Sequence, residues 1–424
     1  MRPTPRIFIP LLLIFCSFRL NAVETNGYNI VLTPLGNLSG KVTLALQTTE
    51  GLVVVDSLPV LRNGALYFTG NQTLEAGQYT FIHNGRRLFN FLISFEKKTD
   101  LHFSALIEKD RTTEVAAFGD LENTAYIEFQ RFIQDINRKP NLSETDIFRI
   151  DNYTDSIARL FPNTILAIIV RNVSTPPLPQ YMALHDRRVL HTSILPIRIQ
   201  SFFTNVVPPQ PEWVIPQIDS ILNRCTDLVV KEWCGAFMLG YFLSSSIMGM
   251  ENAAMYLAKK YLNNEITTPD PDLIDELKTY VSFNERSLLG MPAPELLLPD
   301  ADGRPVSLNA IDANGVILLF YDEDCPICRE EMPDIEQVYR QYKSYGIKVY
   351  AVYTQDNKEA WRSYIRTLNP EWIHVWDPDF SSNFHKLYNV TGTPRMYLLD
   401  KNKIIIGRGL DALLLQQMLS ALFD

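Results

Sequence analysis

The spacing of hydrophobic and polar positions gives residues 23–113 the texture of a β-rich region. Apolar and polar residues alternate in short runs such as 41–46 and 78–82, and Gly, Asn and Asp separate the runs at short intervals. A period of two interrupted by turn residues predicts strands. We therefore expect residues 23–113 to form a β-sandwich with antiparallel pairing.

The texture changes over residues 114–286. Apolar residues recur three and four positions apart in 123–133, and the spacing repeats in several later segments. This is the period of a helix with one buried face. Prolines between positions 176 and 211 divide the region into short pieces. We expect a central α-helical domain of roughly six segments.

Residues 287–424 alternate between the two patterns. Strands separated by helices predict a layered α/β sheet. The expected strands are 306–308, 316–321, 347–353, 372–376, 393–399 and 403–406, and the expected helices are 332–342, 358–368, 380–388 and 411–423.

The first 22 residues have the composition of a secretory signal peptide. Arg2 and Arg6 precede an apolar stretch, 7–18, and the small residue Ala22 then offers a site for cleavage. The stretch is short for a membrane-spanning helix. We expect cleavage after residue 22 and a periplasmic or cell-envelope location, while a lipid anchor at Cys16 and an uncleaved anchor remain alternatives.

Composition narrows the classes of function. The chain has 424 residues, is 46% hydrophobic and 21% charged, and carries a net charge of −9, which is ordinary for a globular protein and unfavourable for nucleic-acid binding. Its six histidines form no HxxxH or HExxH pair, and the chain has a single CxxC motif. We therefore predict no metal, no cofactor and no nucleic-acid partner.

The single CxxC motif is Cys325-Pro326-Ile327-Cys328, and it separates the apolar run 316–321 from a predicted helix. Two intervening residues let both sulfurs meet across one helical turn. Unpaired N–H groups at a helix start favour a thiolate, which is the nucleophile of disulfide exchange. Cys325 is predicted to attack and Cys328 to resolve the mixed disulfide. A structural disulfide or a metal half-site are the alternatives.

Charged neighbours of the motif act in opposite directions. Asp322, Glu323 and Asp324 oppose a thiolate at Cys325, whereas Arg329 and the helix start favour it. The sequence leaves this balance open.

A second pair of cysteines, Cys225 and Cys234, lies in the helical region. In one unbroken helix their separation of nine would place them about 13 Å apart, too far for a disulfide. A turn near Thr226-Asp227 would bring them together. A disulfide, two free thiols and a second redox pair all remain open.

The C-terminal motifs together resemble one known family. The lead-in Gly290-Met291-Pro292-Ala293-Pro294, the segment 302–308, the CxxC motif and Gly392-Thr393-Pro394 are similar to TlpA/ResA-type exported thiol–disulfide oxidoreductases. The resemblance implies a thioredoxin-like fold for 287–424 and a cis Pro394 beside Cys325 and Cys328. It implies that Thr393, Pro326 and Ile327 contact the substrate.

The chain departs from that family's common pattern at two positions. Asp324 stands where many thioredoxins have Trp, and Leu319 stands where thioredoxin has a buried acid. The proton acceptor is therefore unassigned. Upstream, residues 119–123, 161–164 and 249–252 resemble a helical domain attached to TlpA-like proteins of Bacteroidetes, and residues 55–57 and 64–70 resemble the small β-domain before it.

These observations lead to an expected function. We expect an exported enzyme that reduces or exchanges disulfides of envelope proteins and receives electrons from an upstream membrane thiol donor. The direction of its reaction is left open. The alternatives are an envelope binding module with a degenerate redox domain and a peroxiredoxin-like peroxidase, although peroxiredoxins have Thr where this chain has Asp322.

Overall fold

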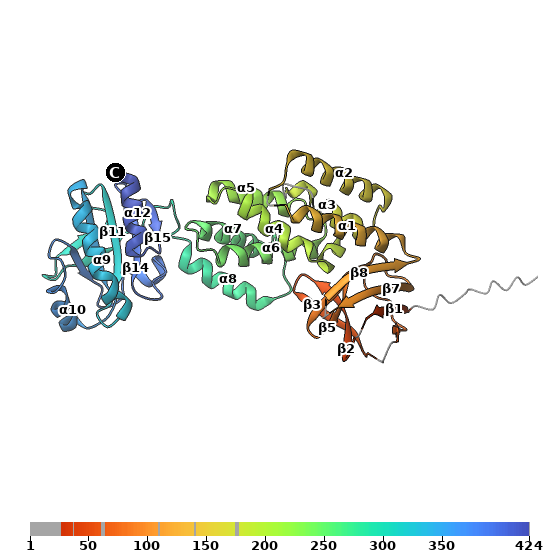
Figure 1. Cartoon of the computed structure of the whole chain (residues 1–424). Helices are drawn as coiled ribbons and strands as arrows, with labels where there is room; N and C mark the ends of the chain where they lie inside the picture. Colours follow the sequence, from red (N-terminus) through yellow and green to blue (C-terminus); the bar gives the residue numbers. More distant parts are fainter. Residues whose placement is uncertain are drawn as a thin grey trace, which may run out of the picture. The chain divides into compact units, whose positions relative to one another are not determined.

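The computed structural model describes residues 27–36, 38–60, 64–108, 111–139, 141–173 and 178–423, and only the backbone of Tyr181. The predicted signal peptide lies outside the described residues. The chain divides into two compact units (Figure 1). The first extends to residue 140 and includes 164–166, and the second contains 141–163 and 167 onward.

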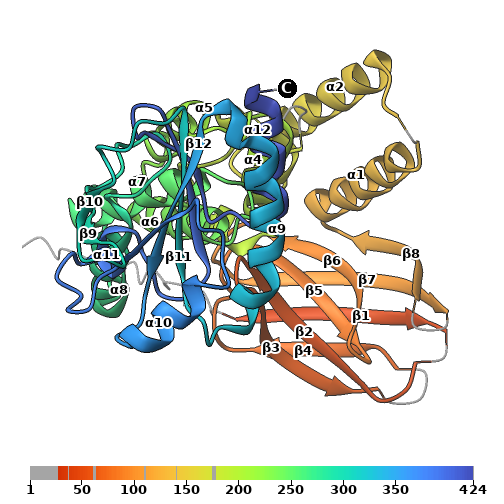
Figure 2. The same cartoon turned by 90° about the vertical axis from the view of Figure 1, so that its left-hand side faces the viewer.

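The strands of the first unit form two four-stranded sheets (Figure 2). Their apolar faces share one core, which includes Phe68, Phe81 and Phe103, so the predicted β-sandwich is confirmed. One sheet has the order β4 (Leu66–Gly70), β1 (Tyr28–Leu35), β7 (Thr99–Glu108) and β8 (Arg111–Phe118). The other has the order β3 (Gly51–Pro59), β2 (Lys41–Thr48), β5 (Gly77–His83) and β6 (Arg86–Ile93).

The expectation of antiparallel pairing is wrong for one strand pair. β1 and β7 run parallel, with Tyr28 opposite Thr99 and Leu35 opposite Leu106. Alternation in the sequence shows which face of a strand is buried, but it carries no information about the direction of the neighbouring strand. The parallel pair therefore could not be predicted from the pattern.

Helix α1 (Leu121–Asn137) belongs to the same unit as the sheets. The Asp120 carboxylate caps its first turn by accepting the Asn123 N–H at 2.6 Å. The Asn123 side chain in turn accepts from the Leu92 N–H and donates to the Leu92 carbonyl, at 2.7 and 2.9 Å, which ties α1 to β6. The expected domain boundary between residues 113 and 114 falls inside β8.

The middle of the chain is helical, as predicted. Aspartate and serine caps fix where several helices begin: Ser143 forms a capping box, and Asp227 and Asp270 accept N–H groups of the first turns that follow them. The helices are α2 (Glu144–Leu160), α3 (Ile165–Arg171), α4 (Ile194–Asn205), α5 (Pro211–Leu222), α6 (Leu228–Leu243), α7 (Met250–Leu262) and α8 (Pro271–Asn284), with short 3₁₀ turns at Pro179–Tyr181 and Arg187–His191.

The C-terminal region is the predicted α/β layer structure. Its five-stranded sheet has the order β13 (Ile373–Trp376), β12 (Ile347–Tyr353), β11 (Gly315–Tyr321), β14 (Arg395–Asp400) and β15 (Ile405–Arg408). β11 is parallel to β12 and antiparallel to β14. The remaining elements are the hairpin β9 (Leu297–Pro299) and β10 (Pro305–Ser307), and the helices α9 (Pro326–Tyr342), α10 (Lys358–Ile365), α11 (Phe384–Leu387) and α12 (Ala412–Phe423).

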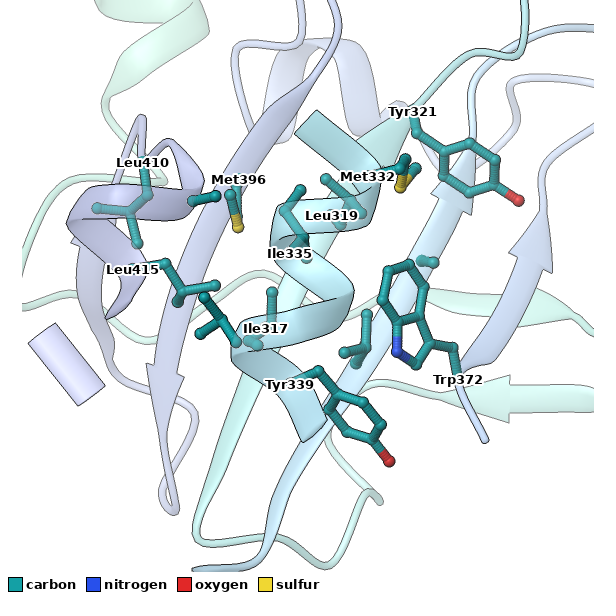
Figure 3. Packing of buried hydrophobic residues seen from close by; sticks show 14 of the residues in the cluster. Ile317, Leu319, Tyr321, Met332, Ile335, Tyr339, Trp372, Met396, Leu410 and Leu415 are labelled. Carbon is teal, nitrogen blue, oxygen red and sulfur yellow. The ribbon is translucent and has the colours of Figure 1, made fainter. Parts of the chain in front are cut away.

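Both faces of this sheet are covered, which explains why the central strand reads as a continuous apolar run. Ile317 and Leu319 lie in one core with residues of α9, α10 and α12, and Figure 3 shows Met332 and Ile335 of α9 beside them. Leu318 and Phe320 lie in the opposite core with residues of α11 and the β9–β10 hairpin. The side chains thus alternate between two buried layers.

The expected helix 380–388 is much shorter in the structure, where α11 spans only Phe384–Leu387. The buried Asp377 carboxylate accepts the N–H groups of Ser381 and Ser382 at 3.1 and 2.9 Å. These hydrogen bonds hold the residues just before α11 in a loop, in which Phe380 and Asn383 take positive φ values of 52° and 59°. A local side-chain cap has replaced the first helical turn.

Candidate active site

The central strand, β11, places the CxxC motif at its carboxyl end. All seven residues of β11 are buried, and the strand ends at Tyr321, whose carbonyl accepts the Thr354 N–H at 3.1 Å. Residues 322–325 then connect the strand to α9, which starts at Pro326. The two cysteines therefore lie at the carboxyl end of the strand and the amino end of the helix, as the sequence predicted.

Cys325 is the N-cap of α9. Its sulfur accepts the Cys328 N–H at 3.3 Å, and its thiol lies 3.1 Å from the carbonyl oxygen of Thr393, to which it can donate. Cys325 is partly exposed, whereas Cys328 has no exposed surface. Of the two sulfurs, only that of Cys325 is open to an incoming disulfide.

The two thiols ionise at different pH. Burial opposes ionisation of Cys325, but hydrogen bonds from the Cys328 N–H, the Thr393 side chain, the Cys328 thiol and the Ile327 N–H outweigh it and lower the pKa of Cys325. Burial raises the pKa of Cys328 to about 12. The arrangement can therefore hold a thiolate at Cys325 while Cys328 stays protonated.

The Thr393–Pro394 segment lies against the CxxC motif. The peptide bond between these residues is cis, which confirms the geometry that the resemblance implied for Pro394. Antiparallel pairing of β14 with β11 places Arg395 opposite Phe320, so Pro394 reaches the end of β11 where the cysteines lie. The Thr393 side chain also hydrogen-bonds to both sulfurs, a contact that the sequence did not reveal.

The predicted substrate-contacting residues surround Cys325. Pro326 and Ile327 are exposed, with 58% of Ile327 accessible, and Thr393 and Pro394 are half-buried. The hydrogen bond from Cys325 to Thr393 joins the helix start to the cis-proline segment. The structure thus brings both predicted parts of the site together.

Two of the three acidic residues before Cys325 bond to other partners through their carboxylates. The Asp322 carboxylate accepts the Asp324 N–H at 2.9 Å and the Gln355 amide at 2.7 Å. The Glu323 carboxylate accepts the Tyr353 hydroxyl at 2.7 Å. The largest contributions to the pKa of Cys325 come from burial and its hydrogen bonds, which answers the balance that the sequence left open.

Cys328 has apolar surroundings at the position of Leu319, which stands where thioredoxin has a buried acid. Leu319 is fully buried and shares a core with Cys328 and Met332. Glu331, which follows Cys328 by three residues, accepts the Ala412 N–H at 3.0 Å and so binds the start of α12. Tyr364 is a polar neighbour that the sequence did not indicate. Burial, followed by the electrostatic influence of Cys328, raises the pKa of Tyr364.

Cys225 and Cys234 form a different kind of pair. Cys225 follows α5, and Asp227 caps the next helix, α6, so the turn considered from the sequence is present. Both cysteines are buried and are separate thiols in the structure. The Cys225 thiol donates to the Ile221 carbonyl at 3.3 Å. A hydrogen bond with Cys225, together with burial, raises the pKa of Cys234 well above its usual value.

The described residues contain neither a metal-binding group nor a membrane-spanning helix. In these residues, no three or more His, Cys, Asp or Glu side chains are grouped so that they could hold a metal ion. Within the same parts of the chain, every helix is too short or too polar to cross a bilayer.

Comparison with known proteins places the C-terminal region. Residues 289–408 match the AhpC/TSA family. The thiol-disulfide oxidoreductase ResA of Bacillus cereus is 26% identical over 127 residues, which cover 30% of this chain and 72% of that protein. A solved domain of a possible thiol-disulfide isomerase from Cytophaga hutchinsonii is 32% identical, with a TM-score of 0.31, covering 33% of this chain and 95% of that one. The solved thioredoxin domain of a Bacteroides vulgatus thiol-disulfide oxidoreductase is 26% identical, with a TM-score of 0.31, covering 32% and 98%.

The C-terminal region is therefore a thioredoxin-like domain of the AhpC/TSA family. Its homologues are ResA-like thiol–disulfide oxidoreductases, and its fold and dithiol fit that activity.

Proposed function

We propose that this protein is an exported thiol–disulfide oxidoreductase that reduces or exchanges disulfides of envelope proteins. The observation that carries the proposal is the asymmetry of the dithiol. Cys325 is accessible and has a lowered pKa, and Cys328 is buried with a pKa of about 12. A nucleophile that ionises more readily than an ordinary thiol and a resolving thiol that stays protonated are the two parts that exchange requires.

The reaction transfers two electrons in two steps. The Cys325 thiolate attacks one sulfur of the substrate disulfide, the substrate S–S bond breaks, and the leaving thiolate takes a proton. Cys328 then loses its proton and attacks the Cys325 sulfur of the mixed disulfide, the bond between Cys325 and the substrate breaks, and the second substrate thiolate leaves and takes a proton. The products are a substrate dithiol and a Cys325–Cys328 disulfide. The reverse sequence oxidises a substrate dithiol.

The cis-proline segment is proposed to hold the substrate. Thr393 offers backbone groups to an extended chain beside Pro394, while the exposed side chains of Pro326 and Ile327 offer apolar surface on the other side of Cys325. The Thr393 carbonyl lies 3.1 Å from the Cys325 sulfur, so a chain bound there would bring its disulfide to the nucleophile.

The wider setting of the reaction follows from the same proposal. The signal peptide at residues 1–22 directs the protein to the periplasm or cell envelope and is then cleaved. There an upstream membrane thiol donor returns the Cys325–Cys328 disulfide to the dithiol. The reduction potential of the pair, measured against a glutathione buffer, distinguishes net reduction from net oxidation.

The activity test compares wild type with Cys325→Ser in the reduction of a peptide that carries one disulfide, with dithiothreitol as electron source. We expect wild type to reduce the peptide faster than dithiothreitol alone and Cys325→Ser to leave the rate of dithiothreitol alone unchanged. Equal rates for the two proteins would refute the proposal. Peroxide consumption, measured with the same pair of proteins, tests the peroxidase alternative.

A further inference from the structure

A cavity of about 480 Å³ opens in the C-terminal domain between α9 and the segment 364–372. Its volume lies in the range of ligand-binding pockets. The lining residues that matter here are Arg329, Met332, Arg340, Tyr364, Leu368 and Trp372. Nothing in the proposed reaction uses this cavity.

The cavity begins beside the dithiol. Arg329 directly follows Cys328, and its guanidinium lies 3.4 Å from the Asp324 carbonyl oxygen, to which it donates. Met332 shares a core with Cys328. Tyr364 has its pKa raised by burial and by Cys328, and Arg329 acts in the opposite direction. One end of the cavity is therefore within the electrostatic reach of the reacting sulfurs.

The cavity is separate from the cis-proline segment. Pro394 leads into β14, which lies on one side of β11, whereas Trp372 leads into β13, which lies beyond β12 on the other side. A substrate chain could therefore contact Thr393–Pro394 and this cavity through different parts of its length. The two surfaces flank the start of α9.

The walls combine an apolar floor with an unused hydrogen-bond donor. Met332, Leu368 and Trp372 supply the apolar surface. Only 4% of Trp372 is exposed, and its indole Nε1 has no hydrogen-bond partner among the described residues. A buried N–H group of this kind normally pairs with an acceptor, so a ligand that brings one is favoured.

Charge at the cavity favours an anion. Arg329 and Arg340 are its cations, and Glu336 is its acid. Glu336 accepts through its Oε1 from the Arg340 Nε at 2.6 Å and from the Asn369 amide at 2.9 Å, whereas its buried Oε2 has no hydrogen-bond partner among the described residues. The bond uses only the Nε of Arg340, whose side chain is 71% exposed. The lining therefore carries a net charge of +1, on a chain whose own net charge is −9. Arginine pairs well with carboxylates.

We propose that this cavity is a second substrate subsite, which takes an apolar side chain of the disulfide substrate together with a neighbouring Asp or Glu carboxylate. This inference rests on the proposed function, since the occupant is part of the substrate polypeptide. Along α9, Arg329 and Arg340 are eleven residues apart, or about 16 Å. An extended peptide covers that span with about five residues.

The first experiment measures binding apart from catalysis. Two peptides are made with every cysteine replaced by serine: one has Phe-Asp four residues after the serine that replaces the attacked cysteine, and the other has Gly-Lys there. Fluorescence anisotropy with wild-type protein should show about tenfold tighter binding of the Phe-Asp peptide, the size expected of a charge-assisted contact. Equal affinities would overturn the subsite.

Variants locate the effect. Arg340→Glu reverses a charge in the lining, and Thr367→Trp fills the cavity from an exposed position. Both should abolish most of the preference for Phe-Asp. Arg366→Glu makes the same charge change at an exposed residue outside this lining and should preserve the preference. If Arg340→Glu and Arg366→Glu behave alike, the cavity is not the subsite.

Activity separates this inference from the proposed function. With the disulfide forms of the two peptides, kcat/KM of wild type should favour Phe-Asp about tenfold, and Arg340→Glu should lose that advantage. Reduction of 2-hydroxyethyl disulfide, which is small and neutral, should be the same in all these variants. Failure to reduce any disulfide refutes the enzyme proposal, whereas the anisotropy result still decides the subsite.

Discussion

Two pairs of cysteines lie in this chain with opposite properties. Cys325 caps a helix, is partly exposed and has a lowered pKa. Cys234 is the seventh residue of α6, is fully buried, and its hydrogen bond with Cys225 contributes to a raised pKa. Both pairs bring two sulfurs within hydrogen-bonding reach. Their difference shows that nearness of two thiols is insufficient for a redox site.

The difference has a simple origin in helix geometry. The first N–H groups of a helix have no partner within the helix, so at the start of α9 the Cys328 N–H is free to bond the Cys325 sulfur. At the seventh position the N–H groups are already used in the helix. Cys234 therefore has a thiol as its neighbour and an apolar surrounding, and both favour its protonated form.

The largest expected effect comes from removing each pair in turn. Cys325→Ser/Cys328→Ser should lower disulfide reduction by at least about 1000-fold, because the nucleophile is lost. Cys225→Ala/Cys234→Ala should keep it within about twofold, since neither thiol reaches substrate. Turnover of a disulfide peptide measures both. Comparable losses in the two double variants would remove the distinction drawn between the pairs.

The pH dependence of alkylation sharpens the comparison. The thiolate is the form that reacts with iodoacetamide, so the lowered pKa of Cys325 should move its half-maximal rate below pH about 8.5, the value for a free cysteine. Cys328 should react only as the pH approaches 12. Cys234 should be protected in the folded protein. Peptide mass mapping after timed alkylation follows each site, and a Cys325 profile at or above that of a free cysteine would contradict the assignment.

A smaller effect isolates the Thr393 hydroxyl. Thr393→Val keeps the carbonyl but removes the side-chain hydrogen bonds to the sulfurs, so the pKa of Cys325 should rise and its alkylation rate at pH 7 should fall about fivefold. Thr354→Val is the matched control. Its hydroxyl donates to Tyr321 at 3.1 Å and contacts neither sulfur. Equal rates in both variants would assign the lowered pKa to other groups.

The smallest effect is on stability. Here the buried pair, Cys225 and Cys234, should matter more than Cys325, which is the reverse of the order expected for activity. Cys225→Ala removes a buried side chain and should lower the free energy of unfolding by about 1–2 kcal/mol. Cys325→Ala changes a partly exposed residue and should alter it by about 0.5 kcal/mol or less. Urea unfolding curves provide the measurement. A larger loss at Cys325 would indicate a structural role for that residue.

Much of the fold could be predicted because it depends on local patterns. The fully apolar 316–321 run, its position before the CxxC motif and the alternation of strands and helices were visible in the sequence. The parallel β1–β7 pair and the short α11 were not, since they depend on strand direction and on the Asp377 side chain. In each case a contact outside the local pattern decided the structure.

The candidate site followed the same rule. Cys325 and Cys328 could be named from their spacing, and Pro394 from a family resemblance. The hydrogen bond between Tyr353 and Glu323 and the bonds of the Thr393 side chain to both sulfurs join residues far apart in the chain. The sequence could not settle the influence of the acids before Cys325, because the partners of the Asp322 and Glu323 carboxylates come from distant parts of the chain.

Trapping of the mixed disulfide tests the central claim most directly. Cys328→Ala protein, incubated with a disulfide peptide and then acid-quenched, should carry one peptide per chain, and peptide mapping should place it on Cys325. An adduct on Cys225 or Cys234, or no adduct although wild type reduces the peptide, would contradict Cys325 as the attacking thiol.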